Sequence, residues 1–232
     1  QGGGSTASVY SGVEAGGRER WRGGGWSQLG DGWRGAVAGS RGGGGLRVLG
    51  GGDHAISCGG VAAWAERGPL GVVGCDARTD VCAGQGGDWH NHKQVLRRIA
   101  TLPQVRRIVQ IGHRGITYQD ETMLSPKMTV FGAEEAAGDI VEAMLAGLSR
   151  DLPVYLSVDI DAIDPVRAPG TGHPVPGGLA PERVADLVDT LRRSRHLVAL
   201  DLTEVNPLPD HADQTAHLAA WLLRRMLTPS PD

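Results

Sequence analysis

The chain has 232 residues, 40% of them hydrophobic, which suffices for one domain with a sizeable core. Its formal net charge of −3 presents no basic face for nucleic acid, and no apolar run approaches the roughly 18 residues of a membrane span. The three cysteines, Cys58, Cys75 and Cys82, suit neither a disulfide framework nor a zinc knuckle, and no signal peptide is visible. We therefore expect a soluble, cytoplasmic protein without a nucleic-acid or membrane partner.

Residues 1–44 are rich in glycine, arginine and tryptophan, as in Arg22-Gly23-Gly24-Gly25-Trp26, and show little hydrophobic periodicity. Such a segment buries too little apolar surface to offset the entropy lost on ordering. We expect residues 1–44 to be poorly ordered, or a remnant of a missing N-terminal segment, and residues 45–232 to form a single domain. An Arg/Gly segment that touches RNA is the alternative, which the acidic total disfavours.

From residue 46 onward, apolar strands alternate with helical patterns about five times. The predicted strands are residues 46–49, 70–73, 107–111, 153–158 and 197–200. The predicted helices are residues 55–66, 92–101, 133–148, 181–193 and 214–226. The strands are apolar throughout, as expected when both faces of a sheet are covered. The pattern predicts an α/β fold with a mostly parallel central sheet and helices on both faces.

The segment Ser157-Val158-Asp159-Ile160-Asp161 ends the predicted strand 153–158. Side chains alternate along a strand, so Asp159 and Asp161 point the same way, and two adjacent carboxylates repel unless protons or cations lie between them. One interpretation is a site for a hard cation, and the other is a strand end that passes into a polar turn.

Three other predicted strands end in similar residues. His54 follows the first strand, Asp76 and Asp80 follow the second, and Asp201 and Glu204 follow the last. In a parallel sheet the carboxyl ends share one edge, so we expect these side chains to converge. Oxygen-rich ligation with one imidazole suits Mn²⁺ better than Zn²⁺, and a water held between two cations becomes a nucleophile near neutral pH. The sequence therefore predicts metal-assisted hydrolysis without naming the substrate.

Four segments also carry a resemblance to a known family. They are Gly51-Gly52-Asp53-His54, Asp76-Ala77-Arg78-Thr79-Asp80, Ser157-Val158-Asp159-Ile160-Asp161 with the loop through Gly178, and Asp201 to Pro207. In order and spacing they resemble the four signatures of the ureohydrolases, the arginase and agmatinase family. The resemblance extends from about residue 46 to the C-terminus. It implies a three-layer α/β/α sandwich that assembles as a homo-oligomer, a trimer or hexamer. It also implies two Mn²⁺ per chain and hydrolysis of a small guanidino compound to urea and an amine.

The same resemblance implies roles for individual residues. His54, Asp76, Asp80 and Asp159 resemble the ligands of one manganese. Asp76, Asp159 and Asp161 resemble ligands of the other, with Asp76 and Asp159 bridging the two ions.

Two acids at the last strand resemble groups that support this centre. Glu204 resembles the carboxylate that grips the substrate guanidinium, a role that suits a fixed carboxylate facing a planar cation. Asp201 resembles a group that orients the metal ligands from behind, and a cap of the strand end is the alternative.

The family's proton-donating histidine lies in the loop after the second signature, which here includes His90-Asn91-His92. His92 is the better positional match, and a histidine can donate a proton near neutrality because its unperturbed pKa is about 6.5. His90 is the alternative, and both histidines could instead be solvated loop residues. His173 stands where many relatives carry threonine, which favours a structural role.

Substrate identity stays open between arginine, agmatine and guanidino acids. The loops Gly112-His113-Arg114-Gly115 and Ala168-Pro169-Gly170-Thr171-Gly172 look closer to agmatinases and guanidino-acid hydrolases. Glu204-Val205-Asn206-Pro207 looks as similar to arginases as to agmatinases.

Arg78 departs from the family pattern, which has a metal-ligating histidine at this position. Arginine stays protonated in proteins and offers only donors, so it cannot ligate a cation. Its guanidinium either lies in the place of the second metal and neutralises Asp161, or swings away and leaves an incomplete site; a sequence-level error is a third explanation. Either arrangement weakens the second metal site and predicts lower activity. The alternative function is a catalytically impaired paralogue that acts as a binding or assembly subunit.

The segment before Gly51-Gly52-Asp53-His54 is the second departure, because it is shorter than in relatives and unusual in composition. We expect an edge strand, a helix and substrate-contacting loops to be absent, which would expose apolar surface of the sheet.

Overall fold

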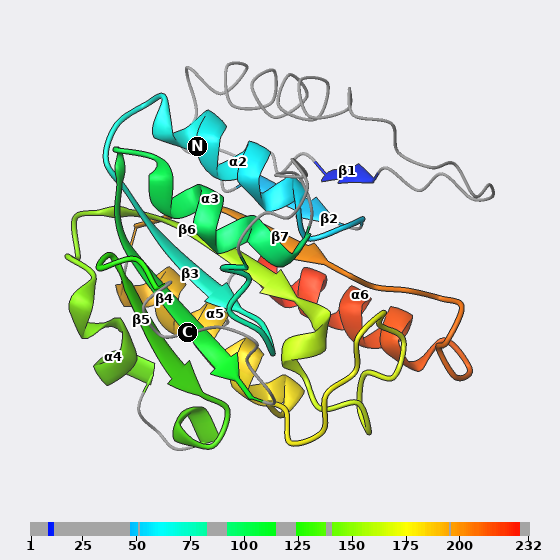
Figure 1. The fold of residues 1–232 in the computed structure, drawn as a ribbon. Coiled ribbons are helices and arrows are strands. Elements are labelled where there is room, and N and C mark those ends of the chain that lie inside the picture. Colours follow the sequence, from blue (N-terminus) through cyan, green and yellow to red (C-terminus); the bar gives the residue numbers. More distant parts are fainter. Residues whose placement is uncertain are drawn as a thin grey trace, which may run out of the picture.

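A computed structural model describes residues 9–11, 47–50, 52–82, 92–114, 124–137, 141–194 and 196–227 (Figure 1). Its strands form one sheet in the order β1-β2-β7-β6-β3-β4-β5, and every neighbouring pair is parallel. The bounds are Val9–Ser11 for β1, Arg47–Gly50 for β2, Leu70–Cys75 for β3, Val105–His113 for β4, Met128–Gly132 for β5, Pro153–Asp159 for β6 and His196–Thr203 for β7. The predicted parallel sheet is confirmed.

Helices lie on both faces of this sheet, as the apolar strands predict. In Figure 1, α2 and α3 cover one face, and α4, α5 and α6 lie on the other. The α-helices are Ile56–Ala65 (α2), Val95–Thr101 (α3), Val141–Met144 (α4), Pro181–Ser194 (α5) and Gln214–Leu227 (α6). Short 3-10 helices are His92–Gln94 (η1), Glu135–Ala137 (η3), Leu145–Gly147 (η4) and Ile160–Ala162 (η5). The three layers give the α/β/α sandwich that the resemblance implies.

The apolar core is divided into two clusters by the sheet. Val73 and Leu156 belong to one cluster, which also contains residues of α5 and α6. Their neighbours Val72 and Tyr155 belong to the other, which contains residues of α2 and α3. Successive side chains of a strand point to opposite faces, so a run of apolar residues supplies both clusters at once. This explains why β3 and β6 are apolar without alternation.

The predicted helix 133–148 is wrong as a continuous helix. The structure has η3 at one end, the single turn α4, and η4, with residues 138–140 outside the described ranges. Gly138 and Gly147 lower the helix propensity of this segment. The guanidinium of Arg107 also passes Gly147 closely, because a Cβ there would lie 3.2 Å from Arg107 Nε.

Two strands of the structure were not predicted from the sequence. The strand β5 was not predicted because Met128–Gly132 offers only a short apolar run, and its side chains are half-buried at the end of the sheet. The strand β1 lies within residues 1–44, where no strand was expected, and it pairs with β2. The rest of residues 1–44, like the predicted domain boundary at residues 44 and 45, lies outside the described residues.

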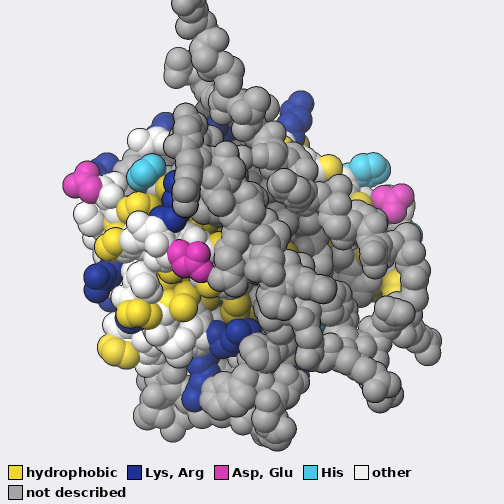
Figure 2. Space-filling model, turned by 90° about the horizontal axis from the view of Figure 1, so that it is seen from above, with side chains coloured by type: hydrophobic (Ala, Val, Ile, Leu, Met, Phe, Trp, Pro, Cys, Tyr) yellow, Lys and Arg dark blue, Asp and Glu magenta, His cyan; other side chains and the backbone are white. Residues whose placement is uncertain are grey.

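None of the helices in the described residues has both the length and the apolar character needed to cross a bilayer. Figure 2 views the molecule from above, where basic, acidic and hydrophobic side chains are interspersed over the coloured part of the face.

Candidate metal centre

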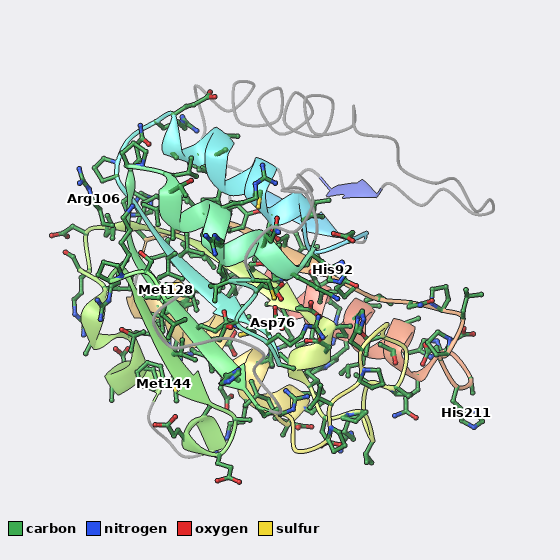
Figure 3. All side chains as sticks on the ribbon, in the orientation of Figure 1. Asp76, His92, Arg106, Met128, Met144 and His211 are labelled. Carbon is green, nitrogen blue, oxygen red and sulfur yellow. The ribbon has the colours of Figure 1, made fainter. Side chains whose placement is uncertain are left out.

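The carboxyl ends of β3, β6 and β7 bring the predicted acids together. The strand β6 pairs with β3 on one side and β7 on the other. Asp76 directly follows β3, Asp159 ends β6, and Asp161 lies in η5 immediately beyond. Figure 3 labels Asp76 and His92 on the side of the molecule to which the arrows of the sheet point. The convergence expected from a parallel sheet is therefore observed.

His54 lies at the centre of one group of carboxylates. Its Nδ1 atom is 3.0 Å from Asp80 Oδ2, 3.2 Å from Asp76 Oδ2 and 3.6 Å from Asp159 Oδ2. The side chain is buried, and burial alone would lower its pKa. Hydrogen bonds to Asp76 and Asp80 outweigh burial and hold the pKa of His54 well above its usual value. A proton on Nδ1 therefore stands where a cation would be bound, and the two compete.

The other ring nitrogen of His54 is held by a chain of buried hydroxyl groups. Its Nε2 atom is 3.2 Å from Ser157 Oγ, which donates to Asp201 Oδ1 at 2.8 Å. Tyr155 donates to the second oxygen of Asp201 at 2.7 Å. Because the Ser157 proton is directed at Asp201, Ser157 accepts from His54 Nε2–H, so Nδ1 offers a lone pair to a metal once its own proton is lost.

Asp201 is not a cap of the strand end. It lies inside β7, which continues to Thr203 beyond the predicted end at residue 200, and it is paired in register with Ser157. This position places its carboxylate behind His54, as the orienting role requires. A strand prediction based on apolar residues alone stopped one residue too early to show it.

Asp76, Asp159 and Asp161 form a second group, whose ligand atoms lie within 4.8 Å of one another. Burial raises the pKa of all three carboxyls, helped by the neighbouring negative charges, and the pKa of Asp161 reaches about 6. The Oδ2 atom of Asp159 is buried and accepts no hydrogen bond among the described residues, whereas Asp76 Oδ2 faces His54 Nδ1 and Asp161 Oδ2 faces Arg78 Nη1. Unsatisfied buried carboxylate oxygens are costly, and a divalent cation would satisfy them. The donor set of His54, Asp76, Asp80 and Asp159 therefore fits one divalent cation.

Glu204 and His92 lie beside this centre. Glu204 follows β7 with a φ of 63°, and its Oε1 accepts the backbone N–H of His54 at 2.6 Å. His92 Nδ1 is 3.5 Å from Asp53 Oδ2, and this contact raises the pKa of His92. Burial raises the pKa of Glu204. Sequence reasoning missed Asp53, although it stands within the Gly51-Gly52-Asp53-His54 signature.

Three other histidines of the sequence analysis, His90, His113 and His173, differ in what the structure shows of them. His90 lies outside the described residues, so its alternative as the proton donor stays a prediction. The ring of His173 is exposed and lies 5.5 Å from that of His92, centroid to centroid. His113 is half-buried at the end of β4.

Comparison with known proteins identifies the family. Residues 34–228 match the model of the Arginase family. The chain belongs to this family. It is 35% identical to mitochondrial agmatinase of Gallus gallus over 190 residues, which are 78% of this chain and 56% of the relative. It is 37% identical over 187 residues to proclavaminate amidinohydrolase of Streptomyces clavuligerus, covering 76% of this chain and 59% of the relative. This arginase-family chain thus spans little more than half the length of such relatives.

Solved structures support the same assignment. The structure titled proclavaminate amidino hydrolase from Streptomyces clavuligerus matches with a TM-score of 0.77 and 29% identity, covering 87% of this chain and 68% of that one. Arginase from Bacillus subtilis matches with a TM-score of 0.76 and 25% identity, covering 89% and 79%. The arginase-like fold expected from the sequence is therefore confirmed.

Arg78 is the residue at which this arginase-family chain differs most from the expected site. Its Nη1 atom is 2.7 Å from Asp161 Oδ2, and its Nε atom is 3.7 Å from Asp80 Oδ1. Burial would lower the pKa of Arg78, but Asp161 and the other carboxylates raise it. The guanidinium therefore stays charged. Of the two arrangements predicted for Arg78, the structure has the one that pairs it with Asp161. Its positive charge therefore lies against the group formed by Asp76, Asp159 and Asp161.

Arg114 is a residue of this site that sequence reasoning did not assign. Within the described residues its guanidinium donates to the backbone carbonyls of Gly112, Asp161, Ala162, Ile163 and Val175. The guanidinium thereby ties η5, which carries Asp161, to the end of β4. Gly178 allows this close packing, because a Cβ there would lie 2.5 Å from Arg114 Nη2. The only signal in the sequence was the Gly112-His113-Arg114-Gly115 loop.

Replacing Arg114 by leucine is expected to destabilise the protein by about 3 kcal/mol, since several charge-assisted hydrogen bonds are lost together. Urea denaturation measures the loss. Arg114→Lys should lose less, because an ammonium group can still reach some of the carbonyls. Arg167→Leu is the control, since Arg167 is 59% exposed in its contact with Glu182 and its loss should change stability by less than about 0.5 kcal/mol. Equal effects of Arg114→Leu and Arg167→Leu would show that Arg114 does not hold the loop.

Proposed function

We propose that this chain hydrolyses the guanidino group of a small molecule to urea and an amine. The observation that carries the proposal is the buried His54 Nδ1 atom, which lies within 3.6 Å of three carboxylates beside Glu204. We further propose Mn²⁺ as the cation, because oxygen-rich ligation with a single imidazole suits it. Relatives named agmatinase, guanidino acid hydrolase and arginase support the substrate class.

Different residues of the site would have different roles in this reaction. When bound, the cation supplies an activated water as the nucleophile. Glu204 would bind the guanidinium of the substrate, since a fixed carboxylate matches a planar cation. A 2.6 Å hydrogen bond from the His54 backbone N–H to Glu204 Oε1 supports this role. Asp201, acting through Ser157, would keep the His54 ring in the orientation that ligation needs.

His92 would donate the proton that the departing amine requires. Its Nδ1 faces Asp53, and among the described residues its buried Nε2 has no hydrogen-bond partner. The raised pKa of His92 means that its imidazolium form is populated near neutral pH. The Nε2–H group is therefore the one available to the leaving group.

We also propose a homo-oligomer, trimer or hexamer, as the working assembly, on the basis of the family resemblance. The cytoplasmic location stays a prediction, since relatives from chicken and human are named mitochondrial.

A panel of guanidino compounds tests the proposed function. We expect the protein loaded with Mn²⁺ to release urea from at least one of arginine, agmatine and 4-guanidinobutyrate. We expect no release after treatment with EDTA or in a His54→Ala variant. Manganese bound to the folded chain without turnover of any compound in a broad panel would contradict the proposal.

The contact between Arg78 and Asp161 favours a second candidate function. An arginase-family chain that holds its cation incompletely could bind guanidino compounds, or assemble with an active relative, without turnover. Binding of agmatine without urea release, together with co-purification with an active relative, would support this alternative. Recovery of urea release in Arg78→His would show that this single residue silences the site.

A further inference from the structure

The guanidinium of Arg78 lies against the acidic group formed by Asp76, Asp159 and Asp161. We propose that Arg78 takes the place of a second metal ion, so that the chain holds one divalent cation and one fixed organic cation side by side. His54, Asp76, Asp80 and Asp159 would hold the metal ion, and Asp161 would be paired with Arg78. This inference rests on the proposed cation site, but it does not require turnover.

The backbone of Arg78 is fixed from two sides. Its N–H group donates to Asp76 Oδ1 at 2.7 Å, and its carbonyl accepts from Gln110 Nε2 at 2.8 Å. Gln110 is fully buried on β4 and reaches this carbonyl across Gly74, where a Cβ would lie 2.4 Å from Gln110 Oε1. The loop after β3 therefore directs the Arg78 side chain toward the acids instead of leaving it free in solvent.

Asp161 is also held in place. Its Oδ1 accepts the backbone N–H of Ala77 at 3.1 Å, and its backbone carbonyl accepts from Arg114 at 2.7 Å. These contacts leave Oδ2 turned toward Arg78 Nη1, which is 2.7 Å away. Since arginine is not deprotonated in proteins and offers no lone pair, the pair persists whether or not the neighbouring site binds a metal.

The charges of the cluster support one metal ion. Four negative charges come from Asp76, Asp80, Asp159 and Asp161, and Arg78 together with one divalent cation leaves a net charge of −1. With a second divalent cation the net charge of the cluster would be +1. A buried net positive charge beside Glu204 would oppose a guanidinium substrate, whereas a net negative charge attracts one.

The number of bound ions tests the inference directly. The full chain is freed of metal with EDTA and equilibrated with Mn²⁺, and the bound ion is counted by equilibrium dialysis and elemental analysis. We expect one Mn²⁺ per chain and the six-line electron paramagnetic resonance spectrum of an isolated ion. Two Mn²⁺ per chain with a spin-coupled spectrum would overturn the inference.

Two variants of Arg78 distinguish the effect of its positive charge on metal binding from the effect of its lack of a lone pair. Arg78→His should bind two Mn²⁺ per chain and show the coupled spectrum. Arg78→Met removes the charge without adding a ligand, and should bind a second Mn²⁺ at least about tenfold more tightly than the unchanged chain. Arg167→His adds a histidine at an exposed position and should still bind one ion. A single ion in both folded Arg78 variants would overturn the inference.

Urea release measured on the same samples keeps this inference separate from the proposed function. One bound ion without turnover would contradict the hydrolase and leave the role of Arg78 intact. Two bound ions with turnover would contradict the proposed role of Arg78 and support the hydrolase.

Discussion

Replacing Glu204 by glutamine is expected to lower kcat/KM for a guanidino substrate by about 10- to 100-fold. The amide is nearly the same shape as the carboxylate, and its oxygen can still accept the His54 backbone N–H that Glu204 accepts at 2.6 Å. The change therefore removes the negative charge that faces the substrate while preserving the positive-φ turn at residue 204. Steady-state urea release at varied substrate concentration measures the effect.

Manganese content separates substrate binding from metal binding in this variant. We expect Glu204→Gln to retain the Mn²⁺ of the unchanged chain, because Glu204 is not one of the residues that surround His54 Nδ1. Glu182→Gln is the matched control, since Glu182 is 64% exposed on α5 and contacts only Arg167 among the ion pairs found in the described residues. Loss of Mn²⁺, or an equal fall in kcat/KM in Glu182→Gln, would show that Glu204 does not act on the substrate.

The metal-free protein is expected to become less stable as the pH rises from about 4 to about 6. Burial and neighbouring charges raise the folded-state pKa of Asp161 from 3.8 to about 6, and they raise the pKa of Asp76 and Asp159 as well. Carboxyls with raised pKa values contribute stability below their unfolded pKa, and this contribution is lost as the pH passes through the folded pKa. For Asp161 alone the loss is about 3 kcal/mol.

His54 changes stability in the same direction at higher pH. Its pKa is also raised in the folded state, so its contribution is complete below pH 6.5 and disappears as the pH rises through the folded pKa. Added Mn²⁺ takes the place of these protons and should stabilise most above pH 6, by about 4 kcal/mol at a concentration 1,000 times its Kd.

Urea denaturation at a series of pH values between 4.5 and 7.5, with EDTA or with Mn²⁺, measures both effects. Asp161→Asn should flatten the lower part of the metal-free profile, because the amide does not titrate. A metal-free stability that increases through this range would contradict the assignment of buried, mutually repelling carboxylates.

Much of this centre could be predicted without a structure because its ligands follow strands. A parallel sheet places the carboxyl ends of its strands along one edge, so the order of strands and acids in the chain is enough to bring Asp76 and Asp159 together. Because the strands are apolar on both faces, they likewise predicted helices on both sides of the sheet. The prediction of a helix over residues 133–148 was wrong because it relied on the helical spacing of the apolar residues, whereas the glycines of this segment disfavour a continuous helix.

Other features depended on which side chains meet across the fold. The sequence identified Arg78 as unable to bind a metal, but only the contacts of its loop with Gln110 and of Asp161 with Ala77 decided that the two residues pair. In the same way, Arg114 became a part of the site because four distant carbonyls, those of Asp161, Ala162, Ile163 and Val175, lie within its reach. Residue type and strand order determine which charges are available, whereas the path of each loop determines which partner each charge finds.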